Sequence, residues 1–159
     1  MSNSMLKWLW VSGLVIVLDQ LSKWVMASWL SLYETVPVIP SINLTMAHNT
    51  GAAFSFLAQE GGWQRWFFTS LAIVISTVLV IWLKKLKSDA RLEALSLSLI
   101  IGGAIGNLID RIYFGYVIDF IDVYYGTYHW PAFNVADSAI CIGAVLLIVD
   151  SFRTESKQA

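Results

Sequence analysis

Two aspartates, Asp119 and Asp137, are the side chains of this sequence best suited to catalysis. Asp119 lies just past one apolar stretch, in the run YVIDF, and Asp137 lies inside the next one, after Pro131. Two carboxyl groups at hydrogen-bond distance share a proton, so that one serves as a base and the other as an acid. Such a pair can activate a water molecule against an amide and then protonate the leaving nitrogen.

Asp19 and Lys23 lie within an apolar stretch, where an ionisable side chain costs at least about 2.5 kcal/mol to insert into a bilayer. Their i,i+4 spacing places them on one helical face. They either neutralise each other and lock their helix against its neighbours, or they contact a substrate or an active-site group. In both cases we expect this face to point into the protein and away from lipid.

Another apolar stretch carries Gly103, Asn107 and Arg111 at the same spacing. Arg111 is either an interfacial anchor whose charge reaches outward or part of a polar pocket, and Asn107, one turn away on the same face, favours the pocket. Gly102 and Gly106 form a neighbouring stripe of small residues, which suits close helix packing.

Two further acids compete with these candidates for a catalytic role. They are Asp122 and Asp110, although Asp110 is expected at a membrane boundary, where a solvated acid is ordinary. Asn49-Thr50-Gly51, in the loop after the first apolar stretch, predicts a turn.

The composition shows that membrane-spanning helices must position these side chains. Of 159 residues, 57% are hydrophobic and only 13% are charged, whereas about a quarter of the residues of a soluble domain are charged. Eight tryptophans are typical of a protein that meets membrane interfaces. A net charge of −1 gives no sign of a nucleic-acid partner. The single cysteine, Cys141, excludes an intramolecular disulfide and a cysteine-cluster metal site.

Four stretches are long and apolar enough to span a bilayer, which requires about 20 residues. We predict spans at about residues 8–29, 66–83, 94–110 and 130–149, with Pro131 in the first turn of the last. A helix that starts there would place Asp137 about 9 Å below its outer end. Most lysines and arginines flank the two termini or join the second and third spans, which predicts cytoplasmic termini and two outer loops.

The outer loops show little helical pattern. Residues 42–46 (INLTM) alternate between apolar and polar, which predicts a short hairpin or sheet in the first outer loop. Asp119 is expected in the second outer loop, outside the spans. The predicted fold class is an all-α membrane protein, a four-transmembrane-helix bundle with a small β-containing extracytoplasmic loop region. Residues 1–159 are expected to form one integral membrane domain.

Several reaction classes lack their motifs. His48 and His129 show no HExxH arrangement or other ligand spacing, which argues against a metalloprotease, and no metal or cofactor is expected. No GxSxG motif and no Ser–His pairing lie within the spans, which argues against a serine protease.

Two other classes of function remain alternatives. One is a small proton-coupled membrane transporter or channel subunit, with Asp19, Lys23 and Asp137 as relay groups. The other is a non-catalytic membrane assembly protein, whose polar groups join the helices. Both predict that a shape-conserving loss of charge at Asp119 has little effect, whereas a peptidase would be inactivated.

Over nearly the whole chain the sequence resembles lipoprotein signal peptidase, also called signal peptidase II. The resemblance lies in residues 18–23 (LDQLSK), 49–54 (NTGAAF), 103–111 (GAIGNLIDR), and 117–120 (VIDF) followed by 133–138 (FNVADS). It implies a bacterial inner-membrane aspartic endopeptidase that cuts prolipoproteins on the N-terminal side of a diacylglyceryl-modified cysteine. The partners implied are that prolipoprotein and membrane phospholipid, without nucleic acid or metal.

The resemblance also implies roles for single residues. Asp119 and Asp137 would form the catalytic dyad. The polar residues around the dyad and the substrate backbone would be Asn49, Gly51, Asn107, Arg111 and Asn134, with Asp19 and Lys23 in support. We further hypothesise that Phe54, Phe56 and Leu57 of the first outer loop lie on the membrane and clamp the substrate.

Overall fold

The computed structural model describes residues 4–51 and 63–155. Within these residues four helices are long and apolar enough to cross a membrane. They are α1 (Leu9–Trp29), α2 (Trp63–Lys85), α3 (Arg91–Tyr113) and α4 (Val135–Glu155), with a short 3-10 turn, η1 (Met5–Trp8), before α1. Apolar side chains such as Trp24, Val74 and Val145 are exposed on the outer surfaces of these helices, as expected for helices that face lipid.

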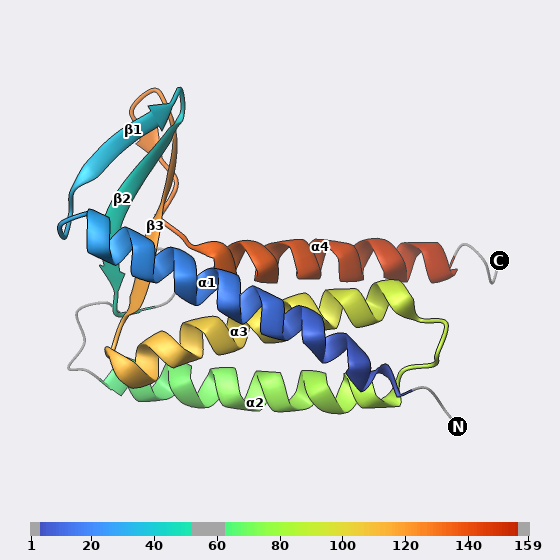
Figure 1. Cartoon of the computed structure of the whole chain (residues 1–159). Coiled ribbons are helices and arrows are strands. Elements are labelled where there is room, and N and C mark those ends of the chain that lie inside the picture. Colours follow the sequence, from blue (N-terminus) through green and yellow to red (C-terminus); the bar gives the residue numbers. More distant parts are fainter. Residues whose placement is uncertain (1–3, 52–62, 156–159) are drawn as a thin grey trace.

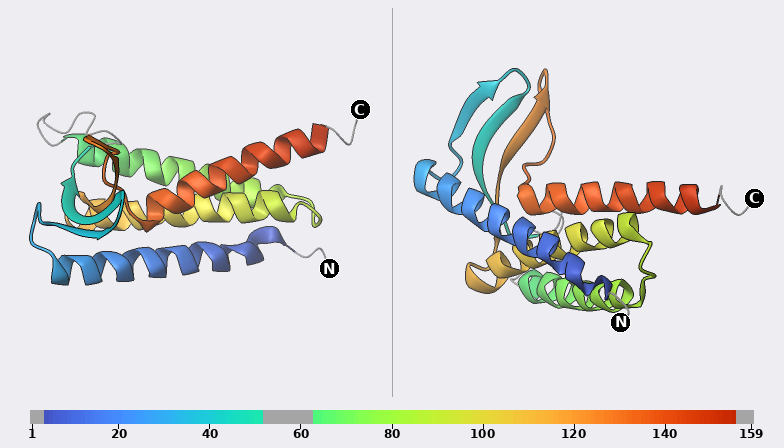
Figure 2. Two further views of the ribbon diagram at one scale, coloured as in Figure 1. Left: turned by 90° about the horizontal axis from the view of Figure 1, so that it is seen from above. Right: turned by 45° about the vertical axis from the view of Figure 1, so that its right-hand side comes forward.

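Helix α3 packs against each of the other three long helices (Figures 1 and 2). A Cβ atom at Gly102 or Gly106 would lie 2.8 Å or 2.7 Å from a side-chain atom of α1. One at Gly103 would overlap the backbone carbonyl of Ala136 on α4. The predicted close packing of the small-residue stripe is thus confirmed, and the glycines allow α3 to approach α1 and α4 together.

A small antiparallel sheet has the strand order β1-β2-β3-β4. Its strands are β1 (Thr35–Ile39), β2 (Ile42–Asn49), β3 (Val117–Tyr125) and β4 (Tyr128–His129). Figure 1 shows the sheet at the end of the molecule where α1 and α3 finish and α4 begins. The beginning of α1, the end of α4 and the connection between α2 and α3 lie at the opposite end.

The strand predicted from residues 42–46 is confirmed as part of β2, but the loop expected around Asp119 is wrong. Asp119 lies in β3 and pairs with Ala47 of β2. The first four residues of β3 are all buried, so the strand shows no alternation of apolar and polar residues by which it could be recognised.

The start predicted for the fourth span is also wrong. Residues 130–134, here called the return segment, do not belong to α4 but run back along β3. The Trp130 amide donates to the Val123 carbonyl at 2.8 Å, and Phe133 and Ile121 exchange backbone hydrogen bonds of 3.0 Å and 2.8 Å. The backbone N–H and C=O groups that would form a helical turn at Pro131 are therefore hydrogen-bonded to β3 instead.

Helix α4 instead begins at Val135 with a reciprocal cap. The Asn134 side-chain oxygen accepts a 2.9 Å hydrogen bond from the Asp137 amide, and the Asn134 amide donates to the Asp137 carboxylate at 3.3 Å. This is the pattern of a capping box, with aspartate in place of glutamate. Asp137 therefore lies in the first turn of α4, and the expected depth of about 9 Å below the helix end is wrong.

Candidate active site

Asp119 and Asp137 line the same cavity, which has a volume of about 770 Å³. Asp119 points there from β3 and is only 2% exposed, whereas Asp137 is partly buried at the start of α4. Most of the remaining wall is apolar and includes Val117, Phe133 and Ile140. The site is thus a largely apolar cavity with two carboxyl groups in its wall.

Asn134 contacts both carboxyl groups. Its Nδ2 donates to Asp119 Oδ1 at 2.7 Å, and its backbone amide donates to Asp137 Oδ2 at 3.3 Å. The side chain is fully buried and also donates to the Ile118 carbonyl at 3.2 Å. A residue held at the end of the return segment therefore sets the relative position of the two aspartates.

Each carboxyl group has a second amide donor. Asn49 Nδ2 donates to Asp119 Oδ2 at 3.0 Å, and Asn107 Nδ2 donates to Asp137 Oδ1 at 2.7 Å. The Asn49 side-chain oxygen accepts from the Gly51 amide at 3.0 Å, which is an Asx turn. The predicted turn at Asn49-Thr50-Gly51 therefore orients the Asn49 amide nitrogen toward Asp119.

Burial raises the pKa of Asp119 from 3.8 to about 7. The charge of Asp137 also raises it, while the hydrogen bonds from Asn49 and Asn134 lower it by stabilising the carboxylate. A carboxyl group with a pKa near neutrality can both hold and release a proton under ordinary conditions, as acid–base catalysis requires.

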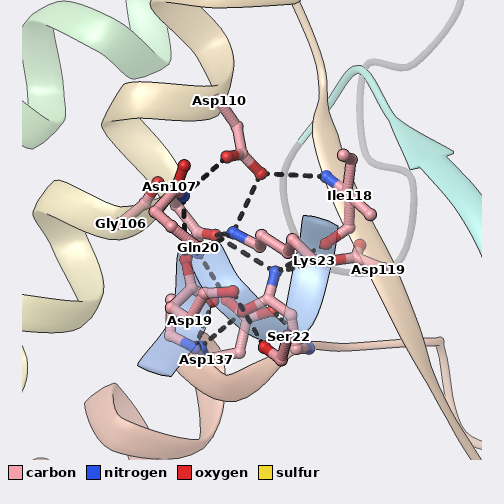
Figure 3. A network of polar contacts seen from close by, with 12 residues as sticks. Asp19, Gln20, Ser22, Lys23, Gly106, Asn107, Asp110, Ile118, Asp119 and Asp137 are labelled. Carbon is pink, nitrogen blue, oxygen red and sulfur yellow. Dashed lines mark hydrogen bonds and ion pairs between the residues drawn. The ribbon is translucent and has the colours of Figure 1, made fainter. Parts of the chain in front are cut away.

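Lys23 is the centre of a buried polar network beside the cavity (Figure 3). Its Nζ lies 2.8 Å from Asp19 Oδ2 and 2.9 Å from Asp110 Oδ2, and it donates to Asn107 Oδ1 at 3.0 Å. The Asp19–Lys23 pair does face the interior, as predicted. It joins α1 to α3 and, through Asn107, reaches the site.

Asp19 and Asp110 each hold the start of an element that carries a candidate catalytic aspartate. Asp19 Oδ1 accepts from the Ala136 amide of α4 at 2.9 Å, and Asp110 Oδ2 accepts from the Ile118 amide of β3 at 3.1 Å. The expectation of a solvated Asp110 is wrong, because the residue is 1% exposed. Its place one turn from Asn107 is a local signal of this role, but its partners on α1 and β3 are not visible in the sequence.

Gln20 is a second residue that sequence reasoning missed. Its Nε2 donates to Asp110 Oδ1 at 2.9 Å and to Asp19 Oδ2 at 3.2 Å, so it links the two acids around Lys23. Gln20 directly follows Asp19 and lies within residues 18–23 (LDQLSK), which resemble the family, and these two facts were the signals of its role.

Arg111 lines the cavity, as the pocket interpretation predicts. Its guanidinium donates to the Gly51 carbonyl at 3.2 Å and lies over the ring of Phe68, 5.4 Å from the ring centre. Gly51 is therefore held between Asn49 and Arg111, beside the cavity wall.

Two further expectations concern residues away from this centre. Asp122 does not belong to the cavity wall and binds Asn43 and His129 instead. Phe54, Phe56 and Leu57, proposed as a clamp, lie outside the described residues. Among residues 4–51 and 63–155, no three His, Cys, Asp or Glu side chains are arranged to hold a metal ion.

Comparison with protein families assigns this chain to a family. The family model for signal peptidase II matches residues 11–153. The chain belongs to the signal peptidase II family. Membership makes it a protease of lipoprotein processing, which cleaves the signal peptides of lipoproteins. Its four long apolar helices fit a multi-pass protein of the bacterial inner membrane.

Curated relatives in the signal peptidase II family support the same assignment. The lipoprotein signal peptidase of Alteromonas mediterranea is 51% identical over 154 residues, which cover 97% of this chain and 85% of that protein. That of Photorhabdus laumondii is 54% identical over 153 residues, or 96% of this chain and 92% of that protein.

Solved structures are similar as well. A bacterial membrane enzyme determined by the in meso method at 2.3 Å resolution has a TM-score of 0.85 and 32% identity, and the match covers 100% of this chain and 96% of that one. A second such structure, at 1.9 Å resolution, has a TM-score of 0.78 and 34% identity over 91% of each chain.

Proposed function

We propose that this member of the signal peptidase II family is an aspartic endopeptidase with Asp119 and Asp137 as its catalytic dyad. Its substrates would be diacylglyceryl-modified prolipoproteins, cut on the N-terminal side of the lipidated cysteine. One observation carries the proposal: Asn134 donates hydrogen bonds to both carboxyl groups, which share the wall of one apolar cavity.

In this mechanism the two carboxyl groups hold one proton as a pair. The ionised group takes a proton from water, whose oxygen attacks the carbonyl carbon of the scissile amide, and the protonated group gives its proton to the carbonyl oxygen. When the tetrahedral intermediate collapses, the C–N bond breaks and the proton taken from water passes to the leaving nitrogen. A hydroxyl of the intermediate returns its proton to the other carboxylate as the new C=O bond forms, so the dyad again holds one proton. The raised pKa of Asp119 supports the retention of such a proton near neutral pH.

The remaining polar residues are proposed to assist this chemistry. Arg111 and Asn49 border the cavity and would bind the substrate backbone, with Gly51 holding the loop between them. Asn107 and Asn134 would keep the dyad in place. Asp19 and Lys23 would support them from behind, through contacts with Ala136 and Asn107.

The membrane arrangement proposed here follows the charge distribution. Residues 1–159 would form one domain in the inner membrane, with both termini cytoplasmic and the site near the periplasmic face. Lys84, Lys85, Lys87 and Arg91 lie at the end of the helices away from the sheet, whereas residues 30–51 and 112–129 at the sheet end contain no lysine or arginine. An apolar cavity suits a substrate whose lipid chains remain among membrane phospholipids.

The test is cleavage of a synthetic prolipoprotein that carries a diacylglyceryl cysteine, by purified protein in detergent. Wild type and Asp89→Asn, a change at an exposed acid outside the site, are expected to cut. Asp119→Asn and Asp137→Asn are expected to fold, as judged by thermal melts, and to lose nearly all activity. Cleavage by Asp119→Asn at a rate close to wild type would refute the dyad. A folded but inactive wild type would refute the peptidase assignment, and proton flux into vesicles would then test the transporter alternative.

A further inference from the structure

A second polar cluster lies on the sheet, outside the site described above. Asp122 accepts a 2.7 Å hydrogen bond from Asn43 Nδ2 of β2, and both of its carboxylate oxygens lie within 3.0 Å of His129 Nδ1. Asp122 is 7% exposed, whereas the His129 side chain is about half exposed. We call Asn43, Asp122 and His129 the sheet clip.

The sheet clip does not face the cavity. None of its three residues belongs to the cavity wall, which Asp119 lines from the same strand. Asn43 is paired with Asp122 across the ladder, and His129 is paired with Tyr124, on which its ring is stacked at 5.2 Å. These contacts exclude Asp122 as a member of the dyad and leave a buried carboxylate in need of another explanation.

The sheet clip does act on the chain that carries the dyad. His129 directly precedes the return segment, residues 130–134, which ends at Asn134. Asp122 lies on the same strand as Asp119. The contact between Asp122 and His129 therefore ties one end of the return segment to β3, the strand that carries Asp119. At the other end of the return segment, Asn134 contacts both candidate catalytic aspartates.

We propose that Asp122 and His129 are positioning residues for the peptidase reaction, because they fix the return segment against β3 and so hold Asn134 between the two catalytic carboxyl groups. This inference rests on the proposed function. Neither residue touches the substrate; both act through Asn134.

The physical reason is the cost of a buried carboxylate that lacks donors. With His129 present, Asp122 has two donors, one from β2 and one from the residue before the return segment. Without the imidazole N–H, Asn43 is the one side-chain donor left to Asp122 among the described residues, and the strand end opens toward water to hydrate the carboxylate. Movement of the return segment then displaces Asn134, and small displacements of groups around reacting atoms cost up to about a hundredfold in rate.

Two substitutions separate positioning from general stability. His129→Phe keeps a ring that can stack on Tyr124 but removes the donor to Asp122, and His129→Asn restores a short N–H donor at that place. Thr35→Val is the control, since it removes an exposed 2.8 Å side-chain hydrogen bond to Thr45 in the same sheet, away from the return segment. Each variant is compared with wild type for kcat, KM and the pH dependence of kcat/KM, and for hydrogen exchange of residues 120–134.

For His129→Phe we expect kcat to fall by about tenfold or more with KM changed by less than about twofold, the signature of a loss confined to the chemical step. The alkaline limb of the pH profile should move to higher pH, because a displaced Asn134 no longer lowers the pKa of Asp119. Amides of residues 120–134 should exchange faster. His129→Asn should recover most of each effect, and Thr35→Val should show none.

If folded His129→Phe shows the same kcat, pH profile and hydrogen exchange as the wild type, the inference is overturned. So would a loss of activity that leaves the pH limb unmoved and is not recovered by His129→Asn, since that pattern indicates a purely structural role. Failure of the proposed function is distinct: the wild type would not cut, or Asp119→Asn would remain active. Even then hydrogen exchange decides the inference, because unchanged exchange in His129→Phe refutes the fixing of the return segment.

Discussion

Replacement of Asp119 by asparagine should make the folded protein more stable relative to wild type as the pH rises. Burial raises the pKa of Asp119 from 3.8 to about 7 in the folded state. A group whose folded pKa is raised contributes stability that is fully present below pH 3.8 and is lost as the pH rises toward 7. Asparagine carries no titrating proton, so the free energy of unfolding of Asp119→Asn does not fall in this way as the pH rises.

The size of the effect follows from the pKa difference. Each pH unit between the two pKa values costs the wild type about 1.4 kcal/mol, so that the variant should gain about 2.5 kcal/mol relative to wild type between pH 5 and pH 8. For a chain of this length that corresponds to about 5–10 °C in Tm. A constant offset of about 1–3 kcal/mol acts against the variant, because Asn49 and Asn134 both donate to the carboxylate and an amide offers only one oxygen.

The assay is a series of thermal melts in one detergent from pH 5 to pH 8, for wild type, Asp119→Asn and Asp89→Asn. The offset shifts the whole Asp119→Asn curve but leaves its slope against pH unchanged, so the slope is the quantity to compare. Asp89 is exposed, and its variant should follow the wild type. If Tm of wild type and Asp119→Asn change in parallel with pH, Asp119 does not hold a proton near neutrality and the acid–base reasoning fails.

Three other changes test the packing and the chemistry. Cleavage by the wild type should fall as the pH rises above about 7, because the dyad loses its shared proton there; a kcat/KM that stays constant to pH 9 would contradict this. Gly103→Ala should lower Tm strongly, since the new Cβ would overlap the Ala136 carbonyl, whereas Gly13→Ala, with nothing within 4 Å, should be neutral or gain about 0.5–1 kcal/mol. Lys23→Met should cost about 3–5 kcal/mol by leaving Asp19 and Asp110 without their cation, and melts should show no such loss for the exposed Lys84→Met.

The parts of the fold that the sequence predicted are those governed by local pattern. Long, predominantly apolar stretches indicated the helices now seen as α1, α2 and α3, with ends that differ by a few residues. The glycine stripe indicated close packing of α3, and Asn49-Thr50-Gly51 indicated a turn. In each case the signal is a pattern of residues that are close together in the sequence.

The parts that could not be predicted depend on contacts between distant segments. The return segment reads as the start of a helix because Pro131 suits a first turn, but backbone pairing of Phe133 with Ile121 of β3 prevails. Asp110 looks like a solvated acid because its partners, Lys23 and the Ile118 amide, come from α1 and β3. Hydropathy and spacing do not record which segments meet, so the charge balance around Lys23 becomes visible only in three dimensions.

The choice of amides over cations beside the two carboxyl groups explains how the site can hold a proton. A lysine or arginine paired directly with Asp119 would stabilise the carboxylate and keep its pKa low. Instead Asn49 and Asn134 donate hydrogen bonds without bringing a charge, and burial prevails, so that the pKa rises to about 7. The buried cation Lys23 is engaged by Asp19 and Asp110 and contacts the site through the side chain of Asn107, and its charge lowers the pKa of Asp119 less than burial raises it. Two acids that look redundant in the sequence therefore have a chemical consequence in the proposed mechanism: they offset the charge of the lysine that fixes the architecture, and the lowering of the Asp119 pKa by Lys23 stays smaller than its raising by burial.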